Sequence, residues 1–221
     1  MLKDRTVLVT GAGRGIGRGI ALAMARAGAH VVVNDYGSLL NGEKDTESAA
    51  DTVVREIQEA GGSAEVNGGS VASFRDAEEM VQQAVNATGR LDALVHVAGI
   101  LRDRMIFNMS EEEWDAVIAV HLKGAFNCFR AAAVRMREQK HGRLIAMSSD
   151  SAYGAAGQPN YAAAKAGILG LVWSTSNALA KYSVTTNAII PSGATRMIDA
   201  TPKGKAHFEQ TGRLLDRKSV V

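Results

Sequence analysis

A glycine-rich turn, placed between an apolar run and a helical pattern, constrains the fold of this chain more than any other feature. Residues 6–10 read Thr-Val-Leu-Val-Thr, and the turn follows directly as Gly11, Ala12, Gly13, Arg14, Gly15, Ile16 and Gly17. Gly11 would permit a tight turn, Gly15 would leave room for a diphosphate, and Gly17 would let the helix pack closely on the sheet. The helix N-terminus would direct unpaired N–H groups toward the diphosphate. The pattern predicts a dinucleotide-binding turn; the alternative is a turn with a structural role only.

Short apolar runs alternate with helical patterns along the rest of the chain. The predicted strands are residues 6–10, 30–34, 63–66, 91–97, 143–148 and 184–190. The predicted helices are residues 16–27, 47–60, 77–87, 110–140 and 161–182. Near-continuous apolar strands separated by helices indicate a parallel sheet covered on both faces. The sequence therefore predicts a doubly wound, three-layer α/β/α Rossmann fold, as one domain over residues 1–221 with an atypical tail at 198–221.

Composition narrows the class of protein. The chain has 221 residues, of which 46% are hydrophobic and 22% charged, with a formal net charge of +2. These values are ordinary for a globular domain and give no bulk charge for binding nucleic acid or a membrane. The one cysteine, Cys128, excludes an internal disulfide and a multi-cysteine metal site, and the histidines lack metal-ligand spacing. No signal-peptide core and no apolar run of bilayer length is expected, which favours a cytoplasmic protein without metal, nucleic-acid or membrane partners.

The identity of the dinucleotide depends on two side chains. Asp35 follows the second predicted strand, where a carboxylate can accept hydrogen bonds from the adenosine ribose and would repel a 2′-phosphate. Arg14 has the opposite tendency, because its guanidinium could pair with a 2′-phosphate, although a solvated surface charge explains it equally well. We give Asp35 more weight, since a carboxylate beside a phosphate dianion is costly. NAD is therefore the expected cofactor, and NADP the less favoured one.

A tyrosine and a lysine begin the helix predicted after the fifth strand. Tyr161 and Lys165 are four residues apart and therefore share one helix face. A lysine ammonium nearby would lower the pKa of the tyrosine, which could then exchange a proton with a substrate hydroxyl. Ser148 and Ser149 end the preceding strand, and a hydroxyl there could hydrogen-bond the substrate oxygen. Alone, such a pair is usually a surface feature; beside a dinucleotide turn, it favours an oxidoreductase site.

Together these segments resemble the short-chain dehydrogenase/reductase family, from Leu2 to about Met197. The family's catalytic tyrosine and lysine match Tyr161 and Lys165. Its catalytic serine matches Ser149 when the strand is the anchor and Ser148 when the loop is counted; we prefer Ser149, because a strand positions a side chain better than loop length does. The positions that the resemblance assigns to the cofactor, besides the glycine turn and Asp35, are Ser70, Val71, Ala98, Gly99, Tyr161, Lys165, Pro191, Gly193 and Thr195.

Within the family, the sequence is most similar to 3-hydroxyacyl-CoA dehydrogenase domains of multifunctional β-oxidation enzymes, and slightly less to 3-oxoacyl-thioester reductases. The matching segments are residues 33–35, 98–104, 120–124, 157–158 and 160–161. The resemblance implies NAD(P)-linked interconversion of a secondary alcohol and a ketone, with a hydroxyacyl or oxoacyl thioester as one candidate substrate. It also implies a homo-oligomer, either a dimer or a tetramer.

Three departures from the family pattern bear on function. His96 and Val97 replace two asparagines that normally tie the central sheet together near the cofactor, so we expect some loss of rigidity or of cofactor affinity. His121 replaces the asparagine of the catalytic tetrad; it could link Lys165 to solvent through water, or be a structural histidine. After Arg196 the pattern weakens, so the C-terminal part and the substrate pocket are expected to be shortened. These departures keep two alternatives open, a non-catalytic dinucleotide-binding protein or redox sensor, and a purely structural subunit.

Overall fold

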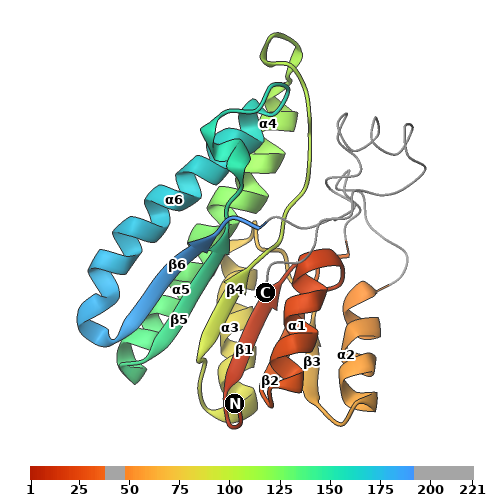
Figure 1. Ribbon diagram of the computed structural model, residues 1–221, viewed down its shortest axis with the longest axis vertical. Coiled ribbons are helices and arrows are strands. Elements are labelled where there is room, and N and C mark those ends of the chain that lie inside the picture. The colour runs from red at the N-terminus through yellow and green to blue at the C-terminus, as the bar shows by residue number, and fades with distance from the viewer. Residues whose placement is uncertain (38–47, 192–221) are drawn as a thin grey trace.

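A six-stranded parallel sheet forms the centre of the computed structural model, which describes residues 1–37 and 48–191 (Figure 1). The strands are β1 (Thr6–Thr10), β2 (His30–Asn34), β3 (Ser63–Asn67), β4 (Ala93–His96), β5 (Gly142–Met147) and β6 (Val184–Ile189). Their order is β3-β2-β1-β4-β5-β6, and every neighbouring pair is parallel. The strand order reverses direction between β1 and β4. In sheets of this kind ligands bind outside the carboxyl ends of the strands at such a point.

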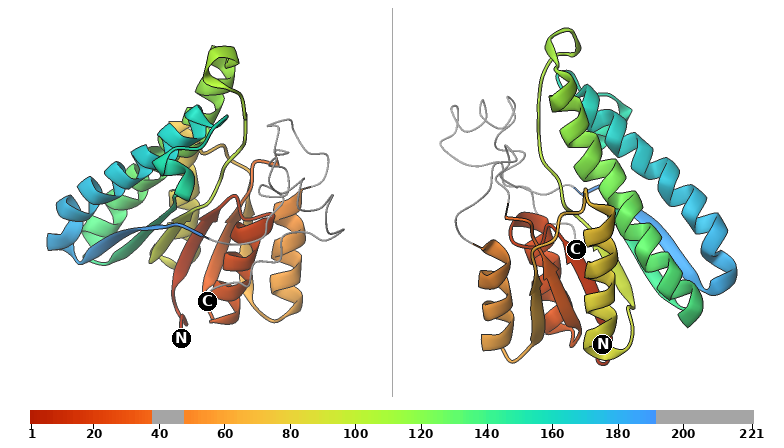
Figure 2. Two further views of the ribbon diagram at one scale, coloured as in Figure 1. Left: turned by 45° about the horizontal axis from the view of Figure 1, so that its top comes forward. Right: turned by 180° about the vertical axis from the view of Figure 1, so that it is seen from behind.

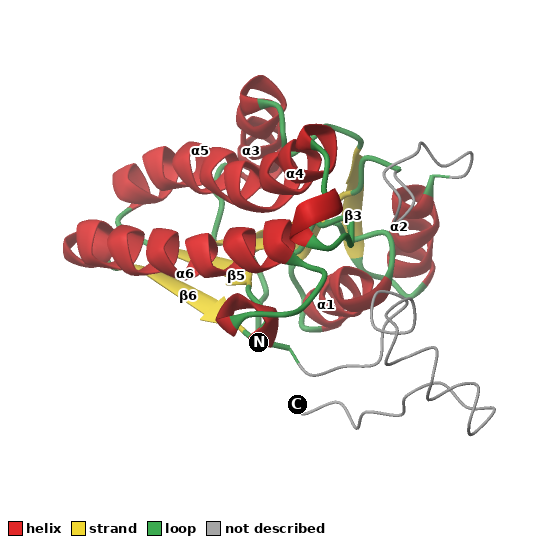
Figure 3. Ribbon diagram, turned by 90° about the horizontal axis from the view of Figure 1, so that it is seen from above, coloured by secondary structure: helices red, strands yellow, loops and turns green. Residues whose placement is uncertain are grey.

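Helices cover both faces of the sheet, as the sequence predicts (Figure 3). The longer helices are α1 (Gly15–Arg26), α2 (Ala49–Glu59), α3 (Phe74–Thr88), α4 (Glu111–Ile118), α5 (Gly124–Gln139) and α6 (Pro159–Leu179). The core on one face joins strand residues to α3, α5 and α6, whereas the core on the other face joins them to α1 and α2. The predicted doubly wound Rossmann fold is therefore confirmed.

The central strands are apolar along their whole length because both of their faces are buried. In β1, Val7 and Val9 pack in the core with α1 and α2, whereas Leu8 packs in the core with α3, α5 and α6. In β2, Val31 and Val33 likewise face away from Val32. Successive side chains of a strand point to opposite faces, so an unbroken apolar run fills two cores at once. Each such side chain, fully buried, stabilises the fold by about 1.5–3 kcal/mol.

The helical pattern predicted as one element over residues 110–140 is interrupted by a π-helical turn. The helix α4 begins with a capping box, in which the Ser110 and Glu113 side chains each bond the backbone N–H of the other. A π turn at Ala119–Lys123 then leads into α5. Such bulges within α-helices are frequently found at functional sites. Here the turn carries His121.

The stretch Glu111–Gln139 corrects one expectation from the sequence. Within the described residues it is the one helix long and apolar enough, by length and composition, to cross a membrane. Half of its most apolar segment is buried inside the domain. The helix runs beside α6 along the sheet (Figure 2), which is the packing of a core helix in an α/β domain.

Candidate active site

The glycine turn between β1 and α1 is closed where the chain packs on itself and open where a ligand would lie. Gly11 has a φ of +63°, and a Cβ there would lie 2.7 Å from the Cα of Ala98. A Cβ at Gly17 would overlap the carbonyl oxygen of Gly11. Gly15, with a φ of +54°, has no atom within 4 Å of its Cβ position, and the residue is exposed. The backbone at Gly15 is therefore accessible to a diphosphate, as predicted, and Gly17 packs against the turn itself.

Asp35 at the end of β2 is built into the same turn. One carboxylate oxygen accepts a hydrogen bond from the Gly13 N–H over 2.9 Å, and the other accepts one from the Gly37 N–H over 2.9 Å. A Cβ at Gly13 would lie 2.6 Å from the Asp35 carboxylate, so only glycine fits there. Each carboxylate oxygen keeps a lone pair for a ribose hydroxyl. Arg14 is half-buried as the N-cap residue of α1.

The other predicted cofactor residues follow strands at the same edge of the sheet. Ser70 and Val71 follow β3, Ala98 and Gly99 follow β4, and Pro191 follows β6. The loop after β3 is held by Asp76, which accepts from the Ser70 N–H over 2.9 Å, and by Asn127, which donates to the Val71 carbonyl over 2.9 Å. Gly193, Thr195 and the tail at 198–221 lie outside the described residues.

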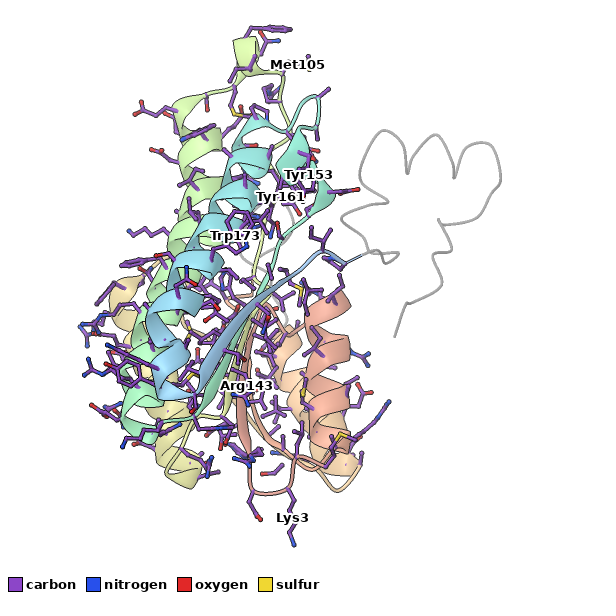
Figure 4. All side chains as sticks on the ribbon, turned by 60° about the vertical axis from the view of Figure 1, so that its left-hand side comes forward. Lys3, Met105, Arg143, Tyr153, Tyr161 and Trp173 are labelled. Carbon is purple, nitrogen blue, oxygen red and sulfur yellow. The ribbon has the colours of Figure 1, made fainter. Side chains whose placement is uncertain are left out.

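Tyr161 and Lys165 both lie on α6. Figure 4 shows Tyr161 toward the end of the molecule that lies away from Lys3. Both side chains are buried, with 8% and 4% of their surface exposed. The Lys165 Nζ donates to the carbonyl oxygen of Met147 over 2.7 Å and lies 5.3 Å from the centre of the Tyr161 ring. Burial lowers the pKa of Lys165 to about 7. The lysine is thus held in place by β5 and can lose its proton near neutral pH.

The expected lowering of the tyrosine pKa by the lysine does not occur within the protein alone. Burial raises the pKa of Tyr161, a hydrogen bond with Ser149 lowers it, and the charges of Asp150 and Asp103 raise it further. Burial is the largest of these effects, because it penalises the charged phenolate. The lowering expected from Lys165 together with a bound oxidised nicotinamide stays a prediction.

The structure distinguishes the two serines after β5. Ser148 is buried, and its hydroxyl donates to the Lys165 carbonyl oxygen over 3.0 Å. Ser149 lies beside Tyr161, and its hydroxyl is partly exposed. Ser148 therefore fastens β5 to α6, and Ser149 is the serine whose hydroxyl can reach a substrate at Tyr161.

His121 in the π turn is buried against the backbone after β4. Its Nε2 lies 2.8 Å from the carbonyl oxygen and 3.1 Å from the amide nitrogen of Ile100, and its ring lies edge-on to Tyr161 with the centres 5.1 Å apart. Burial and the nearby charge of Lys165 lower the pKa of His121 well below its ordinary value. Of the two roles left open by the sequence, the geometry favours a neutral structural histidine that supports Tyr161.

His96 on β4 contacts Thr10 on β1, at a position where the family pattern has an asparagine. The Thr10 hydroxyl accepts from the N–H groups of Val97 and Ala98 over 3.1 and 3.3 Å, and it lies 3.1 Å from the His96 Nδ1. With both lone pairs used, the hydroxyl proton is donated to Nδ1, so the imidazole carries its own proton on Nε2. Burial and Lys165 lower the pKa of His96 to about 3. A neutral histidine therefore joins β1 to β4, and the expected loss of rigidity or affinity stays a prediction.

Four polar residues near the start of α6 were not assigned to the site from the sequence. Gln158 donates to Asp103 over 2.9 Å and accepts from the Ser151 hydroxyl over 3.2 Å. Asp150 accepts from the Ser149 hydroxyl over 3.1 Å. The sequence offered one clue, since Gln158 directly precedes the Pro159–Tyr161 start of α6. Contacts between loops distant in sequence carry no periodic signal, so the network was not predictable.

Comparison with known proteins agrees with this geometry. A profile of the short chain dehydrogenase family matches residues 5–205, and the chain belongs to that family. It is 46% identical over 196 residues to peroxisomal multifunctional enzyme type 2 of Drosophila melanogaster, covering 88% of this chain and 32% of that protein. It is 44% identical over 205 residues to the hydroxyacyl-CoA dehydrogenase ChsB1 of Mycobacterium tuberculosis, covering 89% of this chain and 63% of that protein.

A solved structure is also similar. A short chain dehydrogenase from Mycobacterium avium superimposes with a TM-score of 0.82 at 51% identity, covering 89% of this chain and 70% of that chain. The predicted family is therefore confirmed. The chain spans about a third of the Drosophila multifunctional enzyme that it matches. Among residues 1–37 and 48–191, no group of three or more histidine, cysteine or acidic side chains could hold a metal ion.

Proposed function

We propose that this protein is an NAD(P)-dependent oxidoreductase that interconverts a secondary alcohol and a ketone. One observation carries the proposal: Tyr161, Lys165 and the Ser149 hydroxyl meet at the carboxyl end of the sheet. At the same edge, the turn after β1 is open at Gly15 and lined by Asp35. Family membership and the names of the relatives agree with this class of reaction.

Each side chain has one task in the proposed reaction. Tyr161 accepts the hydroxyl proton of the alcohol during oxidation and returns it during reduction. Ser149 donates a hydrogen bond to the reacting oxygen, whose negative charge grows in the transition state. Lys165 supplies positive charge beside the phenolate and a donor for the ribose. When bound, an oxidised nicotinamide would supply the hydride acceptor and a positive charge that favours the Tyr161 phenolate.

We propose NAD as the preferred cofactor, because the carboxylate of Asp35 lies where the adenosine ribose would bind. Both of its oxygens are fixed by backbone N–H groups, so the carboxylate cannot easily turn away from a 2′-phosphate. Like charges held together in this way are costly. The glycine turn and Asp35 would therefore bind a ribose with two free hydroxyls.

The proposed substrate is a 3-hydroxyacyl or 3-oxoacyl thioester. Support comes from the relatives whose names state such activities, a hydroxyacyl-CoA dehydrogenase and the 3-oxoacyl-[acyl-carrier-protein] reductase FabG of Staphylococcus aureus. The second relative is 42% identical over 192 residues.

We propose a homo-oligomer as well, because Trp173 on α6 is 67% exposed and Phe126 on α5 is 46% exposed. A cytoplasmic location stays a prediction.

The competing function is dinucleotide sensing without catalysis. We would titrate the protein with NADH and NADPH by fluorescence and then follow NADH formation with 3-hydroxyacyl-CoA and simple secondary alcohols. Tighter NADH binding together with turnover is the expected result. Binding without turnover of any alcohol or ketone would favour the sensor, and binding of neither dinucleotide would favour a structural subunit.

A further inference from the structure

Asp150, the residue after Ser149, accepts the hydrogen bond that Ser149 would donate to the substrate in the proposed reaction. The Ser149 hydroxyl accepts from the Ser151 N–H over 3.2 Å and donates to the Asp150 carboxylate over 3.1 Å. A hydroxyl has a single proton to donate, and an ionised carboxylate can only accept. In the protein alone, the proton of Ser149 therefore points toward Asp150, and in the hydrogen bond between Ser149 and Tyr161 the neutral phenol is the donor.

We propose that Asp150 is a positioning residue for proton transfer: it holds the Ser149 proton away from the substrate oxygen and places a negative charge beside Tyr161. This inference rests on the proposed oxidoreductase function. The charge opposes formation of the phenolate, and the hydrogen bond competes with the substrate for Ser149. Asp150 itself gains and loses no proton in the step.

Asp150 is the first residue of a short 3-10 helix. Ser149 is the N-cap of this helix, Asp150–Tyr153, and the Asp150 carboxylate accepts a hydrogen bond from the hydroxyl of this N-cap serine. The Ser151 hydroxyl donates to Gln158 over 3.2 Å, and Gln158 donates to Asp103 over 2.9 Å. Hydrogen bonds through Ser151 and Gln158 thus link the short helix that carries Asp150 to Asp103 in the loop after β4.

The charged and titratable groups near Tyr161 come from four elements. Asp150 lies in the 3-10 helix after β5, and Asp103 in the loop after β4. Lys165 lies one turn further along α6, and the neutral ring of His121 comes from the π turn. The two carboxylates raise the pKa of Tyr161, beyond the effect of its burial. Asp150 is the one of the two that also binds Ser149.

Two substitutions separate charge from hydrogen bonding. Asp150→Asn removes the charge and keeps an oxygen that can accept from Ser149, whereas Asp150→Ala removes both. Asp150 is exposed, so neither change leaves a buried polar group without a partner. Asp103→Asn removes the other nearby charge without touching Ser149, and Glu79→Gln on the exposed side of α3 is a remote control.

The first measurement needs no turnover. Tyrosine labelled with ¹³C at Cζ is titrated by NMR in the cofactor-free protein, with Tyr161→Phe to assign the signal. We expect the midpoint of Tyr161 to fall by several tenths of a pH unit in Asp150→Asn, Asp150→Ala and Asp103→Asn, and to stay unchanged in Glu79→Gln. An unchanged midpoint in both Asp150 variants would overturn the proposal, whether or not the protein proves to be an oxidoreductase.

The second measurement tests the hydrogen bond. We compare the pH profiles of kcat/KM for alcohol oxidation, which rise with pH as Tyr161 ionises. Both Asp150 variants should move this rise to lower pH, because the phenolate forms more easily without the carboxylate charge. On the high-pH plateau, Asp150→Ala should exceed Asp150→Asn by several-fold, since only alanine frees Ser149. Equal plateaus would overturn the positioning role, and inactivity of the unmodified protein would instead refute the proposed function.

Discussion

The ring of His121 occupies the space that a side chain at Gly99 would need. A Cβ at Gly99 would overlap the Cε1 of His121 and lie 3.0 Å from its Nε2. The ring is held there by its contact with the Ile100 backbone and in turn supports Tyr161 edge-on. A glycine in the loop after β4 and a histidine in the π turn thus pack directly against each other.

Substitution of Gly99 should therefore damage both stability and turnover. We expect Gly99→Ala to lower the free energy of unfolding by about 1–3 kcal/mol, the usual cost of overpacking, and to reduce kcat because the support of Tyr161 shifts. Urea denaturation and initial rates measure the two effects. Gly19→Ala is the control, since that exposed helix position has no atom within 4 Å and should be neutral or stabilising. Unaltered stability in Gly99→Ala would contradict the packing described here.

Replacement of Lys165 by an apolar residue should abolish turnover and increase the stability of the fold near neutral pH. Burial lowers the pKa of Lys165 from the ordinary 10.5 to about 7, so the unfolded chain binds a proton that the folded protein releases between these values. The free energy of unfolding of the unmodified protein therefore rises with pH across this range. Below about pH 7, the destabilisation caused by burying the charged lysine has its full size. We expect Lys165→Met to be more stable than the parent at pH 6, with a difference that shrinks toward pH 10, and to lose turnover. Thermal unfolding across pH checks this; a constant difference would contradict it.

Asp92 should contribute to stability at neutral pH and lose its effect in acid. Burial alone raises the pKa of its carboxyl, but hydrogen bonds from Arg90, Thr6 and Arg5 lower it below the ordinary value. A lowered pKa means that the stabilisation is present above the unfolded pKa of about 3.9 and lost as pH falls through the folded pKa. We expect Asp92→Asn to cost about 1.5–3 kcal/mol at pH 7, and less near pH 3. Exposed Asp51→Asn is the control, and a pH-independent loss would count against this account.

Asp35 should control the choice of dinucleotide. We expect Asp35→Ser to weaken NADH binding about tenfold, which is about 1.4 kcal/mol, and to strengthen NADPH binding. Because Asp35 also accepts from Gly13 and Gly37, the substitution affects the turn itself, and the ratio of the two affinities is the informative quantity. Fluorescence titration measures it. A fall in both affinities with an unchanged ratio would remove Asp35 as the basis of selectivity.

Elements with strong local signals were predictable from the sequence. Residues 6–10 and 30–34 form strands with the predicted bounds, because both faces of each strand are buried and the runs are uninterrupted. The turn from Gly11 to Gly17 has the predicted geometry because glycine alone tolerates its positive φ values and close contacts.

Features that depend on contacts distant in sequence were not predictable. No periodic pattern marks the π turn at Ala119–Lys123, since one extra residue in a helix leaves its apolar pattern almost unchanged. The tie through His96 required the position of Thr10 on the neighbouring strand. The raised pKa of Tyr161 reflects burial and the charges of Asp150 and Asp103, which only the folded chain brings together.

The proton-transfer role of Tyr161 is the central claim, and removal of its hydroxyl tests it most directly. Initial rates of NADH formation from a secondary alcohol are compared for the parent protein, Tyr161→Phe and Tyr153→Phe. Tyr153 is the matched control, a tyrosine eight positions earlier that is 79% exposed. We predict that Tyr161→Phe lowers kcat by at least about 100-fold with NADH binding retained, and that Tyr153→Phe keeps the parent kcat. Full activity in Tyr161→Phe would contradict the account.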